Sequence, residues 1–233
     1  VRTAFERCWD YGFAGDNIRV LIRKTIETAK KVYTETNIAG RPVSVVNLAY
    51  RKLRNHAIKD NARFVFVGAG KTNKAMVRFL KKHDYENFVF FNRTQSRAEE
   101  LAKEVEGRAY SLDAIDDFKE GFDVLISCTG AEETVVTKAR FESLLQGETD
   151  QKIVIDLAMP NDIDAEIMAT HKVHYIGIKE LQDIAAENIE YRKKEIKHCD
   201  AIIKQALLEF GMQFEARQVE RAMRAVPEKV KEI

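Results

Sequence analysis

The chain has 233 residues, and its 38 lysines and arginines nearly balance its 37 aspartates and glutamates, for a formal net charge of +1 at pH 7. This length allows one to two domains with a sizeable core, and the charge balance excludes the global basic field that is typical of nucleic-acid-binding proteins. No apolar run approaches membrane-spanning length and the N-terminus lacks the layout of a secretion signal, so we expect a cytoplasmic protein without membrane contact.

Residues 1–58 show only helical patterns. Apolar side chains recur at helical spacing from Ile18 to Ala29, and again from Val45 to Leu53 after a Gly-Arg-Pro break. Two or three helices of this length cannot bury their apolar faces alone, so we expect them to pack against the next domain or against something outside this chain. The sequence also begins at Val1 rather than methionine and opens on a helical pattern with no cap, which indicates a fragment.

From residue 63 to about residue 178, short apolar strands alternate with helices, which is the pattern of a parallel sheet covered on both faces. The predicted strands are Phe64–Val67, Phe88–Phe91, Arg108–Tyr110, Val124–Ser127, Ile153–Leu157 and His174–Ile176. The helices predicted between them include Asn73–Lys82 and Ser96–Val105. Six strands with crossover helices predict an α/β fold with a Rossmann-type, doubly wound parallel sheet.

After Leu181 a single apolar stripe runs through a highly charged segment, and no glycine or proline interrupts it before Gly211. A helix of roughly 33 residues would be about 50 Å long at 1.5 Å per residue, longer than a Rossmann domain is wide. We interpret it as a spine or an oligomerisation arm. A coiled coil stays open as the alternative, although the apolar spacing drifts from a strict heptad.

The most informative motif joins the first two predicted strands. The first strand runs into Gly68-Ala69-Gly70, and the second ends at Asn92-Arg93-Thr94, where an NAD site normally has an acidic residue. A carboxylate there would bind a ribose 2′-hydroxyl and repel a 2′-phosphate, whereas Arg93 can form a charge-assisted bidentate pair with that phosphate. The two motifs together predict NADP(H) rather than NAD(H).

Asn73 stands where the dinucleotide-binding fingerprint has its third glycine. This predicts either a slightly wider turn or an amide that points toward the phosphates. Lys71 and Thr72 open the following helix, whose free N–H groups and dipole favour an anion. An ordinary strand-turn-helix without a ligand is the alternative, and the second motif argues against it.

Residues 127–130, Ser-Cys-Thr-Gly, close the fourth predicted strand at the sheet edge where parallel sheets bind ligands. Small residues there would let the nicotinamide half of a dinucleotide approach the backbone. Cys128 has no His or Lys nearby in sequence to generate a thiolate, so we interpret it as a buried small residue, like Cys8 and Cys199. Three widely spaced cysteines favour reduced thiols over disulfides or a zinc site.

The fifth predicted strand ends in Asp-Leu-Ala-Met-Pro-Asn-Asp-Ile, residues 156–163, a turn pinned by Pro160. Two interpretations stay open, a strand-to-helix loop capped by Asp162 or a wall of the cofactor site. His171 and His174 are three residues apart, but a strand separates their directions and no third ligand follows, so we expect no metal there.

Several features, in order along the chain, resemble the glutamyl-tRNA reductase family. They are Thr34-Glu35-Thr36-Asn37-Ile38 with Val43-Ser44-Val45, Gly68-Ala69-Gly70, Asn92-Arg93-Thr94, Ser127-x-Thr129-Gly130, Asp156-Leu157-Ala158-x-Pro160-x-Asp162-Ile163 and the long helix after Leu181. The likeness covers nearly the whole chain, although the glycine turn, the Asn-Arg-Thr motif and the Ser-x-Thr-Gly motif also occur in shikimate dehydrogenases. The chain departs from the family at Asn73, and at Asn161 where arginine is usual.

The resemblance implies a V-shaped enzyme with an N-terminal catalytic domain, an NADPH domain and a long spinal helix that leads to a dimerisation domain. In that family a cysteine thiolate attacks the glutamyl ester of charged tRNA, and NADPH reduces the thioester to glutamate-1-semialdehyde, a precursor of tetrapyrroles such as porphyrins. The nucleophile lies in a Ser-Thr-Cys-Asn-Arg block that this sequence lacks. We therefore expect the chain to be inactive alone and to contact glutamyl-tRNA only through a missing N-terminal domain.

By this resemblance, residues 1–58 are the helical tail of the catalytic domain and a connector, residues 59–178 are the NADP-binding Rossmann domain, and residues 179–233 are the spinal helix and the start of a dimerisation domain that makes the full-length protein a homodimer. The predicted cofactor contacts are Gly68, Ala69, Gly70, Lys71, Thr72, Asn73, Asn92, Arg93, Thr94, Arg97, Ser127, Thr129, Gly130 and Pro160. No catalytic residue and no metal ligand is predicted in this chain. A shikimate-dehydrogenase-like NADP oxidoreductase and a non-enzymatic nucleotide-binding dimerisation module stay open as alternatives.

Overall fold

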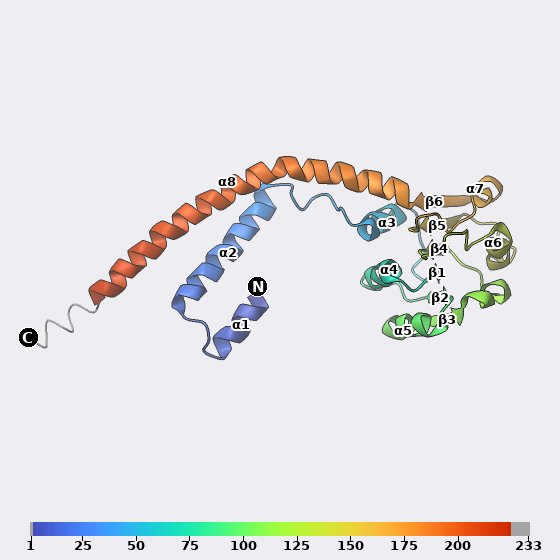
Figure 1. Ribbon diagram of the computed structural model, residues 1–233, viewed down its shortest axis with the longest axis horizontal. Helices are drawn as coiled ribbons and strands as arrows, with labels where there is room; N and C mark the ends of the chain where they lie inside the picture. Colours follow the sequence, from blue (N-terminus) through green and yellow to red (C-terminus); the bar gives the residue numbers. More distant parts are fainter. Residues whose placement is uncertain (1, 225–233) are drawn as a thin grey trace, which may run out of the picture. The chain divides into compact units, whose positions relative to one another are not determined.

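The computed structural model describes residues 2–224 and divides into two compact units (Figure 1). One unit spans residues 42–187 and holds a β-sheet with its covering helices, and the other combines the chain up to residue 41 with the chain from residue 188 onward. The predicted opening at Val1 and residues 225–233 of the predicted dimerisation segment lie outside the described residues. None of the described helices has both the length and the apolar character that crossing a membrane requires.

The sheet has six parallel strands in the order β3-β2-β1-β4-β5-β6. The strands are β1 (Phe64–Val67), β2 (Phe88–Asn92), β3 (Arg108–Ser111), β4 (Val124–Ser127), β5 (Lys152–Asp156) and β6 (Val173–Gly177). This is the order of the doubly wound Rossmann fold, in which the direction of winding reverses between β1 and β4. The predicted α/β class is confirmed, and the predicted strands are all present, with ends that differ by one residue in β2, β3, β5 and β6.

Helices cover both faces of the sheet, which is why the central strands are continuous apolar runs. On β1, Phe64 and Phe66 enter one apolar cluster and Val65 and Val67 enter the other, because alternate side chains point to opposite faces. The first cluster includes residues of α3 (Val45–Arg54), α4 (Lys71–Lys81) and α5 (Gln95–Val105), and the second includes residues of the 3-10 helix η1 (Leu112–Asp117), α6 (Lys138–Leu145) and α7 (Glu166–Thr170).

Helix α3 comes from the predicted all-helical region and packs on the sheet. Leu48, Ala49 and Leu53 are buried in the same cluster as Phe64 and Phe66. This confirms the expectation that part of residues 1–58 packs against the next domain. The first compact unit accordingly begins at residue 42, before α3.

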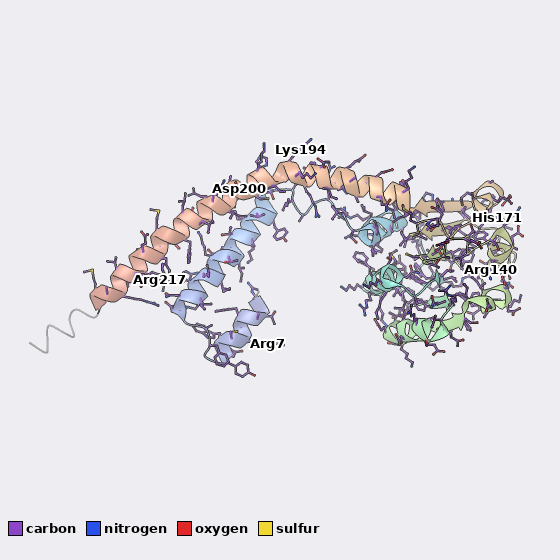
Figure 2. All side chains as sticks on the ribbon, viewed as in Figure 1. Arg7, Arg140, His171, Lys194, Asp200 and Arg217 are labelled. Atoms are coloured by element: carbon purple, nitrogen blue, oxygen red, sulfur yellow. The ribbon has the colours of Figure 1, made fainter. Side chains whose placement is uncertain are left out.

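The second unit contains α1 (Arg2–Asp10), α2 (Asp16–Glu35) and the part of α8 (Ile178–Arg224) from residue 188 onward. Within it, Lys24 of α2 pairs with Glu209 of α8 at 2.7 Å, and Arg217, labelled in Figure 2, pairs with Asp16 at 2.9 Å. Between these two helices lies an apolar groove of about 560 Å³. Both ion pairs lie toward the Asp16 end of α2, and the apolar groove continues past Lys24 to Ile38 and Ile196.

Helix α8 is longer than the sequence pattern indicated. It runs for 47 residues from Ile178 to Arg224 and passes through Gly211, near which the sequence pattern predicted the helix to end. A single glycine inside a helix costs only about 1 kcal/mol relative to alanine, and the surrounding residues are mostly good helix formers. The expectation of roughly 33 residues was therefore wrong in length, and the prediction of one long helix is confirmed.

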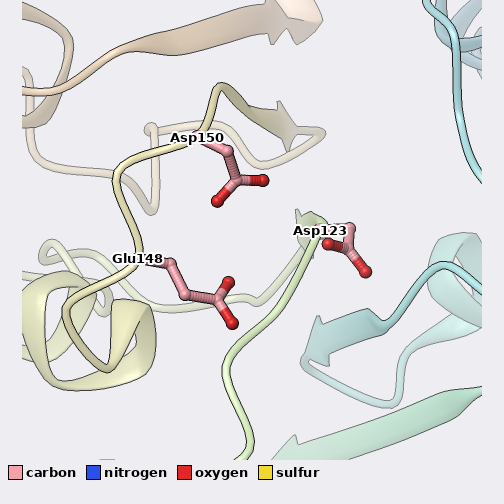
Figure 3. Close-up of side chains that lie close together, drawn as sticks. All are labelled: Asp123, Glu148 and Asp150. Atoms are coloured by element: carbon pink, nitrogen blue, oxygen red, sulfur yellow. The ribbon is translucent and has the colours of Figure 1, made fainter.

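A network of charged side chains lies at the amino-terminal ends of the central strands. The guanidinium of Arg63 donates hydrogen bonds to both carboxylate oxygens of Glu148 at 2.8 Å and to both of Asp123 at 2.9 and 3.1 Å. Lys152 is 1% exposed, contacts Glu148 and lies 2.9 Å from Asp150. Figure 3 shows the three carboxylates facing one another. Hydrogen bonds from Arg63, with Lys152 adding to them, lower the pKa of Glu148 to about 2.

Candidate cofactor site

The turn between β1 and α4 requires glycine at its first position. Gly68 has a φ of +94°, and a Cβ atom there would lie 2.4 Å from the carbonyl oxygen of Cys128. At Gly70, the N-cap of α4, a Cβ atom would meet nothing within 4 Å, so the space in front of the helix N-terminus is open. The free N–H groups and the dipole of this N-terminus favour an anion such as a pyrophosphate.

A cavity of about 410 Å³ opens in front of this turn, at the carboxyl ends of β1, β2 and β4. The predicted contacts that line it are Gly68, Ala69, Gly70, Lys71, Thr72, Asn92, Arg93, Thr94, Arg97, Thr129 and Gly130. In an open parallel sheet, a dinucleotide binds across the point where the winding reverses, which here lies between β1 and β4. The fold thus gathers most of the predicted contacts around one cavity at this switch point.

Asn92 joins the two predicted motifs through its side-chain amide. Its Oδ1 accepts a hydrogen bond from the N–H of Ala69 at 3.1 Å, and its Nδ2 donates to the carbonyl of Thr94 at 2.8 Å. The amide therefore fixes the glycine turn relative to the loop after β2. An ionised aspartate could make only the first of these bonds, because it has no hydrogen to donate.

Three exposed cations stand at the mouth of the cavity. Lys71, Arg93 and Arg97 all line it, and none of them has an ion pair with a carboxylate in residues 2–224. Lys71 opens α4, whereas Arg93 follows β2 and Arg97 lies in the first turn of α5. Positive charge without an acidic partner makes this mouth attractive to phosphate groups.

Asn73 does not line the cavity, and its amide nitrogen points toward backbone carbonyls. The residue is fully buried, and its Nδ2 donates to the carbonyls of Val67 at 2.9 Å and Gly68 at 2.8 Å. The interpretation of an amide directed at the phosphates is therefore corrected. The side chain fills the space that a third glycine would leave and braces the turn from behind, while its Oδ1 has no hydrogen-bond partner among the described residues.

Ser127 is also buried and does not line the cavity, in contrast to the prediction. Its hydroxyl donates to Oδ2 of Asp162 at 2.7 Å, and Asp162 accepts two further bonds from Thr129. Asp162 is therefore not a helix cap, because Asp164 accepts the hydrogen bond from the N–H of Glu166 in the first turn of α7. The sequence signal that could have revealed this role is the position of Asp162 beside apolar Ile163, which indicates burial. A buried carboxylate needs several hydrogen-bond donors around it.

Pro160 is exposed, follows a cis peptide bond and does not line the cavity. The loop that contains it is anchored instead by Asp156, which accepts hydrogen bonds from two backbone N–H groups of that loop. Burial raises the pKa of Asp156. Asn161 donates to the hydroxyl of Tyr175 at 2.7 Å, and burial raises the pKa of that phenol to about 12. These contacts hold the loop beside the site without bringing Pro160 into it.

Cys128 lines the cavity as a half-buried thiol. Its Sγ lies 3.3 Å from the carbonyl oxygen of Leu157, and burial raises its pKa. A raised pKa keeps the group protonated at neutral pH, which opposes a role as nucleophile. Cys8 is exposed on α1, whereas Cys199 is buried against α2, where its Sγ is 3.6 Å from Oγ1 of Thr36.

We expect one fast-reacting thiol in the native protein. With 5,5′-dithiobis(2-nitrobenzoic acid), exposed Cys8 should react first, and Cys128 and Cys199 should react slowly because of burial and, for Cys128, its raised pKa. The substitution Cys8→Ser should remove the fast phase, and denaturant should release the two slow thiols. A fast phase that survives in Cys8→Ser would contradict this assignment.

His56 and His174 contact each other, whereas His171 and His198 have other surroundings. The rings of His56 and His174 are in contact, with centroids 3.8 Å apart, and burial lowers the pKa of His174. His171 instead packs against the ring of Phe141. The side chain of His198 is 73% exposed, so it does not form a dyad with its buried neighbour Cys199.

Residues 47–184, more than half of the chain, match the shikimate / quinate 5-dehydrogenase family. The chain belongs to this family. The matched segment contains most of α3, all six strands and the beginning of α8, so the family match and the cavity lie in the same compact unit. Membership of the shikimate / quinate 5-dehydrogenase family, together with the Rossmann fold, implies a nucleotide cofactor.

Curated relatives that match nearly the whole chain are glutamyl-tRNA reductases. The protein of Carboxydothermus hydrogenoformans is 31% identical over 90% of this chain and 47% of its own length, and that of Archaeoglobus fulgidus is 30% identical over 89% and 48%. The chain spans about half the length of the curated relatives that it matches. A solved glutamyl-tRNA reductase from Methanopyrus kandleri superposes with a TM-score of 0.76 and 25% identity, over 96% of this chain and 61% of that one. The resemblance inferred from the motifs is confirmed.

Proposed function

We propose that this chain is the NADPH-binding portion of a glutamyl-tRNA reductase, the enzyme that reduces glutamyl-tRNA to glutamate-1-semialdehyde for tetrapyrrole synthesis. The observation that carries the proposal is the cavity at the switch point, lined by the glycine turn and by exposed Arg93 and Arg97. Relatives named glutamyl-tRNA reductase along about nine-tenths of the chain support it. When bound, NADPH supplies the hydride.

We assign different residues around the cavity to different parts of the cofactor. The backbone of Gly68–Gly70 and the N-terminus of α4 at Lys71 would hold the pyrophosphate, because N–H groups and the helix dipole converge there. Arg93 and Arg97 would bind the 2′-phosphate, since guanidinium groups form bidentate, charge-assisted bonds with phosphates. Thr129 and Gly130, at the end of β4, would lie along the nicotinamide half.

We expect the chain to bind NADPH at least about tenfold more tightly than NADH, because charge-assisted bonds to one extra phosphate are worth roughly 1.5–3 kcal/mol. Titration followed by the fluorescence of the reduced nicotinamide measures both affinities. The substitution Arg93→Gln should weaken NADPH and leave NADH unchanged. Arg54→Gln is the matched control, because Arg54 is an exposed cation of α3 that does not line the cavity. Equal affinity of the unmodified chain for both nucleotides would refute the cofactor assignment.

We assign the thiol that attacks the glutamyl ester to none of the three cysteines of this chain. Cys199 is buried, Cys128 has a raised pKa, and Cys8 stands exposed on α1 without the Ser-Thr-Cys-Asn-Arg block around it. The relatives are about twice as long as the matched region, and we assign the nucleophile, the contacts with glutamyl-tRNA and the homodimer interface to a full-length reductase.

A complete shikimate-type dehydrogenase is less well supported than this assignment. The curated relatives that match about nine-tenths of this chain are named glutamyl-tRNA reductase. Hydride transfer from NADPH to dehydroshikimate by the purified chain would favour that function. A dimer without nucleotide affinity would instead favour a non-enzymatic interaction module.

A further inference from the structure

We propose that Asp162 is a positioning residue for the nicotinamide half of the cofactor site, an inference that rests on the proposed NADPH-binding function. Asp162 is fully buried in the loop after β5 and does not line the cavity. Burying a carboxylate costs folding free energy unless its oxygens are fully hydrogen-bonded. The donors of those hydrogen bonds therefore show which part of the chain the carboxylate positions.

All three of its donors come from the segment that closes β4. Oδ2 of Asp162 accepts from the hydroxyl of Ser127 at 2.7 Å and from the N–H of Thr129 at 2.7 Å, and Oδ1 accepts from the hydroxyl of Thr129 at 2.5 Å. These are short, charge-assisted bonds, roughly twice as strong as neutral ones. The carboxylate therefore joins the loop after β5 to the end of β4 and fixes both the backbone and the side chain of Thr129.

Thr129 lies on the side of the cavity where the nicotinamide belongs. Arg93 and Arg97 mark the adenosine side at the end of β2, and a dinucleotide crosses from there over the switch point to β4. Thr129 lines the cavity, whereas Asp162 and Ser127 stand behind it. Asp162 thus acts on the cofactor only through Thr129, and it should affect one half of the dinucleotide.

Two ligands separate the halves. Adenosine 2′,5′-bisphosphate carries the adenosine, the 2′-phosphate and the 5′-phosphate, and NADPH adds the second phosphate of the pyrophosphate and the nicotinamide with its ribose. In Asp162→Ala, NADPH affinity should fall about tenfold while that for adenosine 2′,5′-bisphosphate stays within about twofold, because Thr129 loses the two bonds that hold it in position beside the nicotinamide half. The fluorescence enhancement of the bound reduced nicotinamide should also decrease.

Three further variants exclude a general loss of structure. Asp162→Asn keeps an oxygen for the N–H of Thr129 and should restore most of the NADPH affinity. Ser127→Ala serves as a milder variant in case Asp162→Ala misfolds, because Ser127 touches Asp162 but does not line the cavity. A loss of about two- to threefold confined to NADPH is expected, since one of the bonds that hold the Asp162 carboxylate is removed. Asp164→Ala, the matched control, loses only a bond to the N–H of Glu166 and should bind both ligands normally.

The outcomes separate the positioning role from the proposed function. Equal weakening of both ligands in Asp162→Ala and Ser127→Ala would assign Asp162 a purely structural role and overturn the inference. Unchanged affinity for both ligands would overturn it as well. An unmodified chain that binds neither ligand would instead refute the NADPH site itself, and the inference with it.

Discussion

Replacing Gly68 with alanine is expected to lower the free energy of unfolding by about 3 kcal/mol, because strain at a positive φ and a backbone clash add together. The new Cβ atom would lie 2.4 Å from the carbonyl oxygen of Cys128 and 3.1 Å from its carbonyl carbon. Both atoms belong to the backbone at the end of β4, so no flexible side chain can move aside. Urea denaturation measures the stability. Nucleotide titration should show a loss of NADPH affinity of more than about tenfold, because the turn to which we assign the pyrophosphate is displaced.

Gly70→Ala provides the matched control for this change. Gly70 has no positive φ, and a Cβ atom there would meet nothing within 4 Å. Its stability should therefore stay within about 0.5 kcal/mol of the original, as expected for a substitution that meets no neighbour. If Gly68→Ala were as stable as Gly70→Ala, the close approach between the glycine turn and β4 would not exist in solution.

Replacing Lys152 with methionine is expected to destabilise the fold by about 3 kcal/mol at neutral pH, since it removes one partner from a buried charge network. Methionine keeps the apolar stem but leaves Glu148 and Asp150 without the ammonium group that they contact. Lys204→Met is the control, because Lys204 is 71% exposed and pairs with Asp200 on the surface of α8. Such surface pairs contribute only about 0.3–0.5 kcal/mol.

The loss of stability in Lys152→Met should depend on pH, and the ionisation of Glu148 sets the direction of this dependence. Its pKa is lowered from 4.5 to about 2 in the folded protein, so its contribution to stability is complete above pH 4.5 and is lost as the pH falls toward 2. The stability difference between the original chain and Lys152→Met should therefore shrink between pH 5 and pH 2. Urea denaturation at a series of pH values tests this, and a difference that does not change with pH would contradict the network.

The strands could be predicted because the sheet is covered on both faces. Each central strand is a short, uninterrupted apolar run, and residues such as Phe64 and Val65 are buried on opposite sides. The glycine turn and Arg93 could be predicted for a different reason, since both belong to a motif in which the chemistry of the ligand fixes the residue types.

Asn73 and Asp162 could not be predicted in their observed roles. Whether a polar side chain faces a ligand or braces the backbone depends on the donors and acceptors that tertiary packing brings to it. Asp162 meets Ser127 and Thr129 only because β4 and β5 pair in register, with Ser127 opposite Asp156. The length of α8 was missed because Gly211 is tolerated inside a helix of otherwise good helix formers.

The two hydrogen bonds of Asn92 join the glycine turn to the loop after β2. Its amide accepts from Ala69 and donates to Thr94 at the same time, which a carboxylate cannot do. The position that specifies NAD in many Rossmann proteins is thus occupied here by part of the backbone scaffold. An acid at this site would leave the carbonyl of Thr94 without this donor, so the loop after β2 would have to change together with residue 92.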